Sequence, residues 1–440
     1  MRFFSRVCVV VVLAMTTAPL LAEPATGLRD YVDKKDDSFK FEVKSNHDLG
    51  QTKILSVRLT SQKWRDTEWQ HWLTIIVPGK IQYPDKAILF ITGGSSRDSA
   101  PSLDSKAAKM FIPLAERTNA VFAVLQQVPN QPLYEGKYED ALIAHTFAKY
   151  IETGDNEWPL LLPMTKSAVK AMDAVQAIVK ERINKDITGF VVTGASKRGW
   201  TTWLTAATQD KRVIAIAPMV IDVLNFDPQM KHQRESYGKL SEQIGDYDKL
   251  NLPDKLKTEN GKKLNALVDP YSYRKDIKIP KLILLGTNDP YWTVDASSIY
   301  FNNLVGSRHL YYEPNAGHGL GAGIYPTLLA FFHASMAGKT LPRLTWEKKA
   351  DGTISASWDD KFATATLWEA KSDTRDFRKA KWTPSPLEAD GKVDAKVAEP
   401  KQGWSAFYVE VKFPSAGIGP FSVCTEMSVL PKALPFKDAK

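Results

Sequence analysis

Short apolar runs alternate with helical stretches through most of this chain, and no other feature of the sequence constrains its fold as strongly. A buried strand is expected at each of residues 87–92, 120–125, 187–193, 213–219, 281–285 and 308–313. Runs that are apolar on both faces are typical of parallel strands covered by helices on both sides. Two earlier runs, 54–59 and 72–77, lie close enough in the sequence to pair with each other. The alternation predicts a mostly parallel sheet in an α/β protein.

Two of the intervening stretches show helical periodicity. The first covers residues 163–183, and its apolar residues recur at spacings of three and four. The apolar face of this helix consists of Val169, Met172, Val175 and Val179. A second helix is expected at 106–117, interrupted at Pro113, because a proline inside a helix removes a backbone hydrogen bond.

The segment 226–273 breaks the alternation, because it is rich in Lys, Asp and Gln and has no apolar run typical of a buried strand. We expect a helical insertion that covers the active site as a cap. After residue 339 the pattern changes to short segments, several of them alternating apolar and polar residues, with Asp-Gly turn signals between them. Residues 340–440 are therefore expected to form a small antiparallel β-sandwich, with its last strand at 421–429.

The motif with the clearest chemical meaning is Gly194-Ala195-Ser196-Lys197-Arg198-Gly199, which follows one apolar run and precedes a helical stretch. A serine in a tight strand-to-helix turn is typical of a nucleophile elbow, where large neighbours would clash. The small residues around Ser196 meet that demand, although the second glycine falls one place later than in G-x-S-x-G. The alternative is a serine that only caps the helix. We interpret Ser196 as a catalytic nucleophile.

A serine nucleophile needs a histidine base and an acid that orients the imidazole. Asp289 follows one expected strand, and His318 lies between two glycines after the next expected strand. The order serine, acid, histidine is that of an α/β-hydrolase, and the ends of parallel strands are where such sites are built. The sequence therefore predicts a triad of Ser196, Asp289 and His318, with Asp295 as the alternative acid.

The oxyanion of the transition state needs two backbone N–H donors. The N–H of Lys197, directly after the nucleophile, is the first candidate. Gly94 is the second, with Ser95 as the alternative, because this loop follows an apolar run and its glycines allow close approach. Arg198 is a candidate for binding an anionic part of the substrate. An ion pair with a local carboxylate that braces the loop is the alternative for Arg198.

Several other side chains are candidates for the substrate pocket. Trp292 is predicted to bind substrate, and Tyr291, Trp200 and Trp158 are expected either in an aromatic pocket or in the core. The acidic pair Glu139 and Asp140 could hold a substrate amine. The alternative for this pair is a solvated acidic start of a helix.

Domain organisation follows from these patterns and from the N-terminus. Residues 1–22 begin with Arg2 and Arg6, continue in an apolar run and end in small residues, which is typical of a secretory signal peptide. An uncleaved membrane anchor is the alternative. An α/β-hydrolase domain with a mostly parallel central sheet is expected over 23–339, with the helical cap insertion at 226–273 and the β-sandwich at 340–440. The mature protein is expected to be periplasmic or secreted, with no stable membrane span.

Composition excludes several classes of function. The chain has 440 residues, 25% charged and 43% hydrophobic, as in ordinary globular proteins. Its formal net charge of +8 comes from scattered basic residues, so nucleic-acid binding is not predicted. No His or Cys cluster has metal-ligand spacing, and no glycine loop carries the lysine of a P-loop, so no metal and no cofactor are expected. Cys424 lies in an apolar run and is expected to be buried.

Several stretches of the sequence are similar to those of a known family. They are Trp158-Pro159-Leu160-Leu161-Leu162-Pro163-Met164, Lys166-Ser167-Ala168-Val169, Gly194-Ala195-Ser196-Lys197-Arg198-Gly199-Trp200-Thr201, Pro218-Met219-Val220-Ile221-Asp222-Val223-Leu224-Asn225 and Gly286-Thr287-Asn288-Asp289. In these the chain resembles the PhoPQ-activated pathogenicity-related proteins, and the resemblance covers most of residues 30–430. It implies an α/β-hydrolase with a β-sandwich tail and a catalytic triad of Ser196, Asp289 and His318. The family name implies regulation by a bacterial two-component sensor linked to virulence and antimicrobial-peptide resistance.

Two functions follow from the sequence. The first is an exported serine hydrolase that cleaves a small-molecule ester or a peptide through the triad. The second is a non-catalytic binding or signalling protein on an α/β-hydrolase scaffold. The intact Ser196, Asp289 and His318 favour the hydrolase. No protein partner is predicted.

Overall fold

The computed structural model describes residues 27–414 and 419–438. The central strands are β1 (Lys40–Leu49), β2 (Thr52–Trp64), β3 (Thr67–Val77), β4 (Lys86–Ile91), β5 (Val121–Leu125), β6 (Gly189–Ala195), β7 (Val213–Met219), β8 (Lys281–Gly286) and β9 (Arg308–Glu313). They lie in the order β1-β2-β3-β5-β4-β6-β7-β8-β9. The pairs β1–β2, β2–β3 and β3–β5 are antiparallel, and from β5 to β9 the neighbours are parallel. This strand order is that of the α/β-hydrolase fold, so the predicted fold class is confirmed.

Two layers of helices cover the sheet. The helices of the hydrolase body are α1 (Gly27–Asp33), α2 (Lys106–Thr118), α3 (Glu139–Thr153), α4 (Leu161–Ile183), α5 (Lys197–Ala207) and α10 (Ile324–Met336). α4 packs against α5, and α2 packs against α10. The predicted apolar face of α4 is buried against the sheet. The expected interruption at Pro113 is wrong, because α2 continues through this residue.

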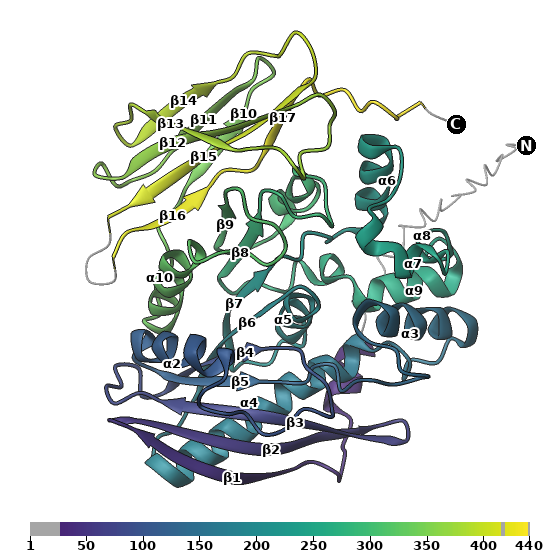
Figure 1. Ribbon diagram of the computed structural model, residues 1–440, viewed down its shortest axis with the longest axis vertical. Coiled ribbons are helices and arrows are strands. Elements are labelled where there is room, and N and C mark those ends of the chain that lie inside the picture. Colours follow the sequence, from purple (N-terminus) through teal and green to yellow (C-terminus); the bar gives the residue numbers. More distant parts are fainter. Residues whose placement is uncertain (1–26, 415–418, 439–440) are drawn as a thin grey trace, which may run out of the picture.

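The segment between β7 and β8 is helical, as predicted. It contains α6 (Phe226–Tyr237), η1 (Glu242–Ile244), α7 (Gly245–Asp248), α8 (Leu252–Lys255), α9 (Glu259–Val268) and η2 (Pro270–Tyr273). Figure 1 shows α6 to α9 gathered with α3 on one side of the central strands. That side is where the parallel strands end and where the proposed site residues lie. We refer to residues 226–273 as the cap.

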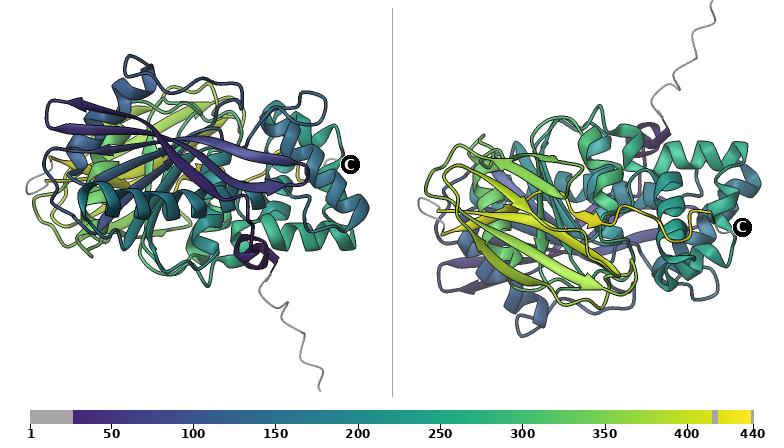
Figure 2. Two further views of the ribbon diagram at one scale, coloured as in Figure 1. Left: turned by 90° about the horizontal axis from the view of Figure 1, so that it is seen from below. Right: turned by 90° about the horizontal axis from the view of Figure 1, so that it is seen from above.

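The C-terminal strands form two antiparallel sheets. They are β10 (Thr345–Lys348), β11 (Thr353–Ser357), β12 (Thr364–Ser372), β13 (Thr383–Leu387), β14 (Lys392–Lys396), β15 (Trp404–Phe413), β16 (Phe421–Cys424) and β17 (Ser428–Leu430). One sheet has the order β10-β11-β14, and the other joins β13, β12, β15 and β16, with β17 also on β15. The larger sheet continues the central sheet, because Cys424 of β16 pairs with Leu310 of β9. Figure 2 shows these strands, in yellow and light green, packed beside the hydrolase body.

The single last strand expected at 421–429 is wrong, because residues 425–427 separate β16 from β17. The side chain of Thr425 accepts a hydrogen bond from the Val409 N–H at 3.0 Å. The buried carboxylate of Glu426 accepts hydrogen bonds from Asn302 and Trp346. These buried polar contacts turn the chain out of the ladder. Cys424 is buried, as expected.

The predicted signal peptide at residues 1–22 lies outside the described residues. Across 27–414 and 419–438, we find no helix long and apolar enough to cross a membrane. The division of the chain near residue 339 stays a prediction.

Candidate active site

Ser196 occupies a strained turn between β6 and α5. Its backbone has φ 58° and ψ −125°, a conformation that residues other than glycine rarely adopt. A Cβ at Gly194 would lie 2.8 Å from the Arg198 carbonyl oxygen, and a Cβ at Gly199 would lie 2.8 Å from the Met219 carbonyl oxygen. The two glycines therefore allow the strand and the helix to approach closely, as a nucleophile elbow requires.

Asp289 and His318 lie together at the ends of β8 and β9. His318 Nδ1 is 2.8 Å from Asp289 Oδ2, and the Tyr291 N–H donates to Asp289 Oδ1 at 2.9 Å. Because Asp289 holds Nδ1 as the protonated nitrogen, Nε2 is left to accept a proton. The ring of Tyr291 packs on the imidazole, with centroids 4.3 Å apart. The acid and the ring together fix the orientation of His318.

Ser196 and His318 line the same cavity. His318 Nε2 is buried and, among the described residues, has no hydrogen-bond partner, so the serine–histidine contact is open here. Catalytic hydrogen bonds are often long before substrate binds and shorten in the complex. The structure thus brings Ser196 and the His318–Asp289 pair to one cavity.

Asp295, the alternative acid, lies in a different cluster. Arg375 donates to its Oδ2 at 2.7 Å, and His232 Nε2 is 2.9 Å from its Oδ1. Burial opposes ionisation of Asp295, but the charges of Arg375 and His232 outweigh it and hold the pKa of this carboxyl well below its usual value. These contacts make Asp295 a structural ion-pair partner, and it does not bind His318.

The two cations beside the nucleophile are both paired with the acids at the start of α3. Arg198 donates to both carboxylate oxygens of Glu139, at 2.6 and 2.7 Å, and to the Val128 carbonyl at 2.6 Å. Lys197 Nζ is 2.9 Å from Asp140 Oδ2 and 3.5 Å from Glu139. Burial opposes ionisation of Glu139, but the hydrogen bonds and charge of Arg198 lower the pKa of its carboxyl.

These contacts favour the bracing role that the sequence left as an alternative for Arg198. The guanidinium is buried, and its N–H groups donate to the Glu139 carboxylate and to the Val128 carbonyl. Asp140, in contrast, lines the cavity beside Ser196, where the Tyr247 hydroxyl also donates to it at 3.0 Å. The acidic start of α3 thus forms an ion-pair network with the two residues that follow Ser196.

The predicted oxyanion donors, the N–H groups of Lys197 and Gly94, follow the adjacent parallel strands β6 and β4. The N–H of Lys197 is the first of α5, and the first N–H groups of a helix have no acceptor within the helix. Gly94 has φ 133°, which favours glycine. The N–H of Ser95, the alternative, donates to Asp98 at 2.7 Å, so it is already used. Ser95 is therefore the less available of the two donors, and Gly94 stays a prediction.

A loop of the C-terminal sheets, residues 372–382, contacts the loops that carry Asp289 and His318. Asn288 donates to the Ala380 carbonyl at 2.7 Å. Asn315 and Trp382 exchange two hydrogen bonds, at 2.7 and 3.0 Å. We call residues 372–382 the strap. No periodic pattern in the sequence marks these contacts.

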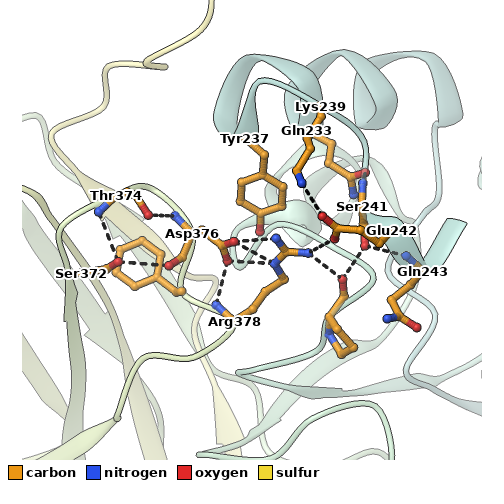
Figure 3. A network of polar contacts seen from close by, with 12 residues as sticks. Gln233, Tyr237, Lys239, Ser241, Glu242, Gln243, Ser372, Thr374, Asp376 and Arg378 are labelled. Carbon is orange, nitrogen blue, oxygen red and sulfur yellow. Dashed lines mark hydrogen bonds and ion pairs between the residues drawn. The ribbon is translucent and has the colours of Figure 1, made fainter. Parts of the chain in front are cut away.

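The strap also holds the cap. Figure 3 shows Arg378 between Asp376 of its own loop and Glu242 of η1, beside the ring of Tyr237. The guanidinium carbon lies 4.7 Å from the centroid of that ring. Arg375 is buried and donates to Ser236 of α6 at 2.8 Å. The C-terminal sheets therefore fix the cap relative to the triad loops.

Asp222 is a buried acid that the sequence reasoning missed. It follows β7 and lines a small cavity that also touches Asp289. Burial, with the negative charges of Asp289 and Asp295, raises the pKa of Asp222 to about 8. Its only sequence signal was its place in a stretch shared with the family.

Comparison with known proteins gives the family. The sequence profile described as PhoPQ-activated pathogenicity-related protein matches residues 28–378. The chain belongs to this family. A relative in sequence is autocrine proliferation repressor protein A of Dictyostelium discoideum. It is 30% identical in an alignment of 460 positions that covers 94% of this chain and 92% of that protein. The family match ends within the strap.

Solved structures with a similar shape carry the names of esterases. Acetyl xylan esterase 1 from Thermoanaerobacterium sp. JW/SL YS485 is 14% identical to this chain, with a TM-score of 0.48. The match covers 70% of this chain and 92% of that chain. A glucuronoyl esterase from Solibacter usitatus is 13% identical, with a TM-score of 0.40, over 72% of this chain and 92% of that chain. At these scores the likeness carries no argument about the activity of this chain.

Proposed function

We propose that this protein is a serine hydrolase that cleaves an ester or a peptide bond through Ser196, His318 and Asp289. The observation that carries the proposal is the strained Ser196 backbone beside a cavity that Ser196 and His318 both line, with His318 Nδ1 2.8 Å from Asp289. A strained serine at the end of a strand is maintained only where the surrounding structure enforces it.

The chemistry follows from the positions of these groups. His318 Nε2 takes the proton of the Ser196 hydroxyl as the oxygen attacks the substrate carbonyl, and then gives it to the leaving group. Asp289 stabilises the imidazolium that forms. We assign the stabilisation of the oxyanion to the N–H groups of Lys197 and Gly94. The acyl group then leaves Ser196 by the same steps with water as the nucleophile.

A non-catalytic binding role on this scaffold is the competing proposal, because such a role needs no hydrogen bond between Ser196 and His318. Turnover separates the two. We expect the wild type to hydrolyse 4-nitrophenyl butanoate or an alanine 4-nitroanilide, and Ser196→Ala to lose this activity by at least about a thousandfold. Ser307→Ala is the matched control, because Ser307 also contacts a histidine, at 3.1 Å from His309. No turnover by the wild type on any ester or amide would favour the binding role.

We propose that the protein is exported, on the signal-like segment 1–22. A link with virulence and antimicrobial-peptide resistance stays a prediction from the family name.

A further inference from the structure

The cavity beside Ser196 has apolar walls from two parts of the chain. Residues such as Trp200 and Val220 come from the hydrolase body, and Phe226, Met230 and Ile244 come from the cap. With the other lining residues they border a space of about 730 Å³, which includes open solvent. The cap therefore forms a wall of the cavity as well as covering it.

The two side chains of this cavity with a full charge at neutral pH, Lys197 and Asp140, are paired with each other. The Lys197 ammonium and the Asp140 carboxylate are 2.9 Å apart, and the Tyr247 hydroxyl donates to the same carboxylate. Arg198 donates both of its terminal N–H groups to Glu139, and it does not line the cavity. A substrate charge placed here would have to break an existing ion pair and lose its hydration, which is costly.

We propose, resting on the proposed function, that this cavity takes a neutral apolar group attached to the scissile carbonyl. The substrate class is thus an ester or amide of a short to medium neutral acyl group, and neither Lys197 nor Asp140 recognises a substrate charge. Each methylene buried in such a pocket is worth about a fourfold increase in kcat/KM, until the cavity is filled.

The hydrolysis test compares 4-nitrophenyl esters that differ only in the acyl group. From acetyl to butanoyl, and again from butanoyl to hexanoyl, we expect kcat/KM to rise at least about tenfold, because each step adds two methylenes worth about fourfold each. The succinyl ester, which carries a carboxylate, and the 6-aminohexanoyl ester, which carries an ammonium, should both react more slowly than the hexanoyl ester. A flat series, or a preference for either charged ester, would overturn the proposal.

A substitution in the cavity wall tests whether this cavity holds the acyl group of the substrate. Met230→Trp introduces a larger side chain into the wall, so the ratio of kcat/KM for the hexanoyl ester to kcat/KM for the acetyl ester should shrink. Met110→Trp is the matched control, since Met110 is exposed on α2 and does not line the cavity. Equal effects of the two substitutions on the chain-length ratio would contradict the assignment.

A binding measurement tests the apolar site independently of the proposed hydrolase activity. Calorimetric titration of Ser196→Ala with hexanamide and acetamide needs no turnover, and hexanamide should bind at least about tenfold more tightly. Binding of hexanamide without turnover of any ester by the wild type would sink the hydrolase and keep the apolar site. Turnover by the wild type with no preference for hexanamide would sink the apolar site and keep the hydrolase.

Discussion

The side-chain amide of Asn288 donates to the carbonyl oxygen of Ala380 at 2.7 Å, which ties the residue before Asp289 to the strap. The same amide lies 3.3 Å from the carbonyls of Phe377 and Arg378. The C-terminal sheets are thus part of the support of the triad. They are not only an appended module.

We therefore expect Asn288→Ala to lower kcat by about tenfold to a hundredfold with little change in KM, because a small displacement of Asp289 misorients His318. The loss of stability should be about 1 kcal/mol. Asn260→Ala is a matched control, since Asn260 also donates to a carbonyl, at 3.0 Å, but lies on α9 away from Asp289. Steady-state kinetics and urea unfolding measure both effects. Equal kcat values for the two variants would rule out a role of the strap in catalysis.

Substitutions of Asp289 and Asp295 should have different effects, the first on kcat and the second on the free energy of unfolding. Asp289→Asn should lower kcat by about ten-thousandfold with a small change in stability, because the wrong tautomer of His318 is then favoured. Asp295→Asn leaves the buried Arg375 without its carboxylate and should cost about 3–5 kcal/mol of stability. Its folded fraction should keep most of the activity. The reverse pattern would show that Asp295 is the catalytic acid.

Asp222 should make stability fall as pH rises. Its pKa of about 8 in the folded protein lies above that of an unfolded aspartate, so between about pH 4 and pH 8 the folded state holds a proton that the unfolded state has released. The stability that this proton contributes is complete below about pH 4 and is lost as the pH approaches 8, by up to about 1.4 kcal/mol per pH unit.

Urea unfolding of the wild type and of Asp222→Asn from pH 5 to pH 8 measures this effect. The variant should gain stability relative to the wild type as the pH rises. Asp373→Asn, at an exposed position of the strap, controls for the loss of a charge. If the curves of the wild type and Asp222→Asn stay parallel, Asp222 does not carry a raised pKa.

The features that the sequence predicted well are those with a local pattern. The buried face of α4 follows from apolar spacing, and the turn at Ser196 follows from the small residues around it within a single hexapeptide. The order of acid and histidine then placed Asp289 and His318 on the ends of adjacent strands. Each of these signals is complete within a few residues or in the order of the elements.

The features that the sequence did not predict are polar contacts between distant segments. Glu139 and Arg198 are 59 residues apart, and Asn288 and Ala380 are 92 residues apart. A single polar residue in a loop has no periodicity, so its partner becomes visible only in the folded chain. For the same reason the sequence placed Asp295 as an alternative acid, although Arg375 occupies it.

The central claim is that Ser196 is a nucleophile activated by His318. Peptide mass mapping after reaction with an alkyl fluorophosphonate tests it most directly, because this reagent phosphonylates activated serines. We predict one adduct, on Ser196, formed by the wild type, absent from Ser196→Ala and strongly slowed in His318→Ala. An adduct on another serine, or equal labelling of the wild type and Ser196→Ala, would contradict the account.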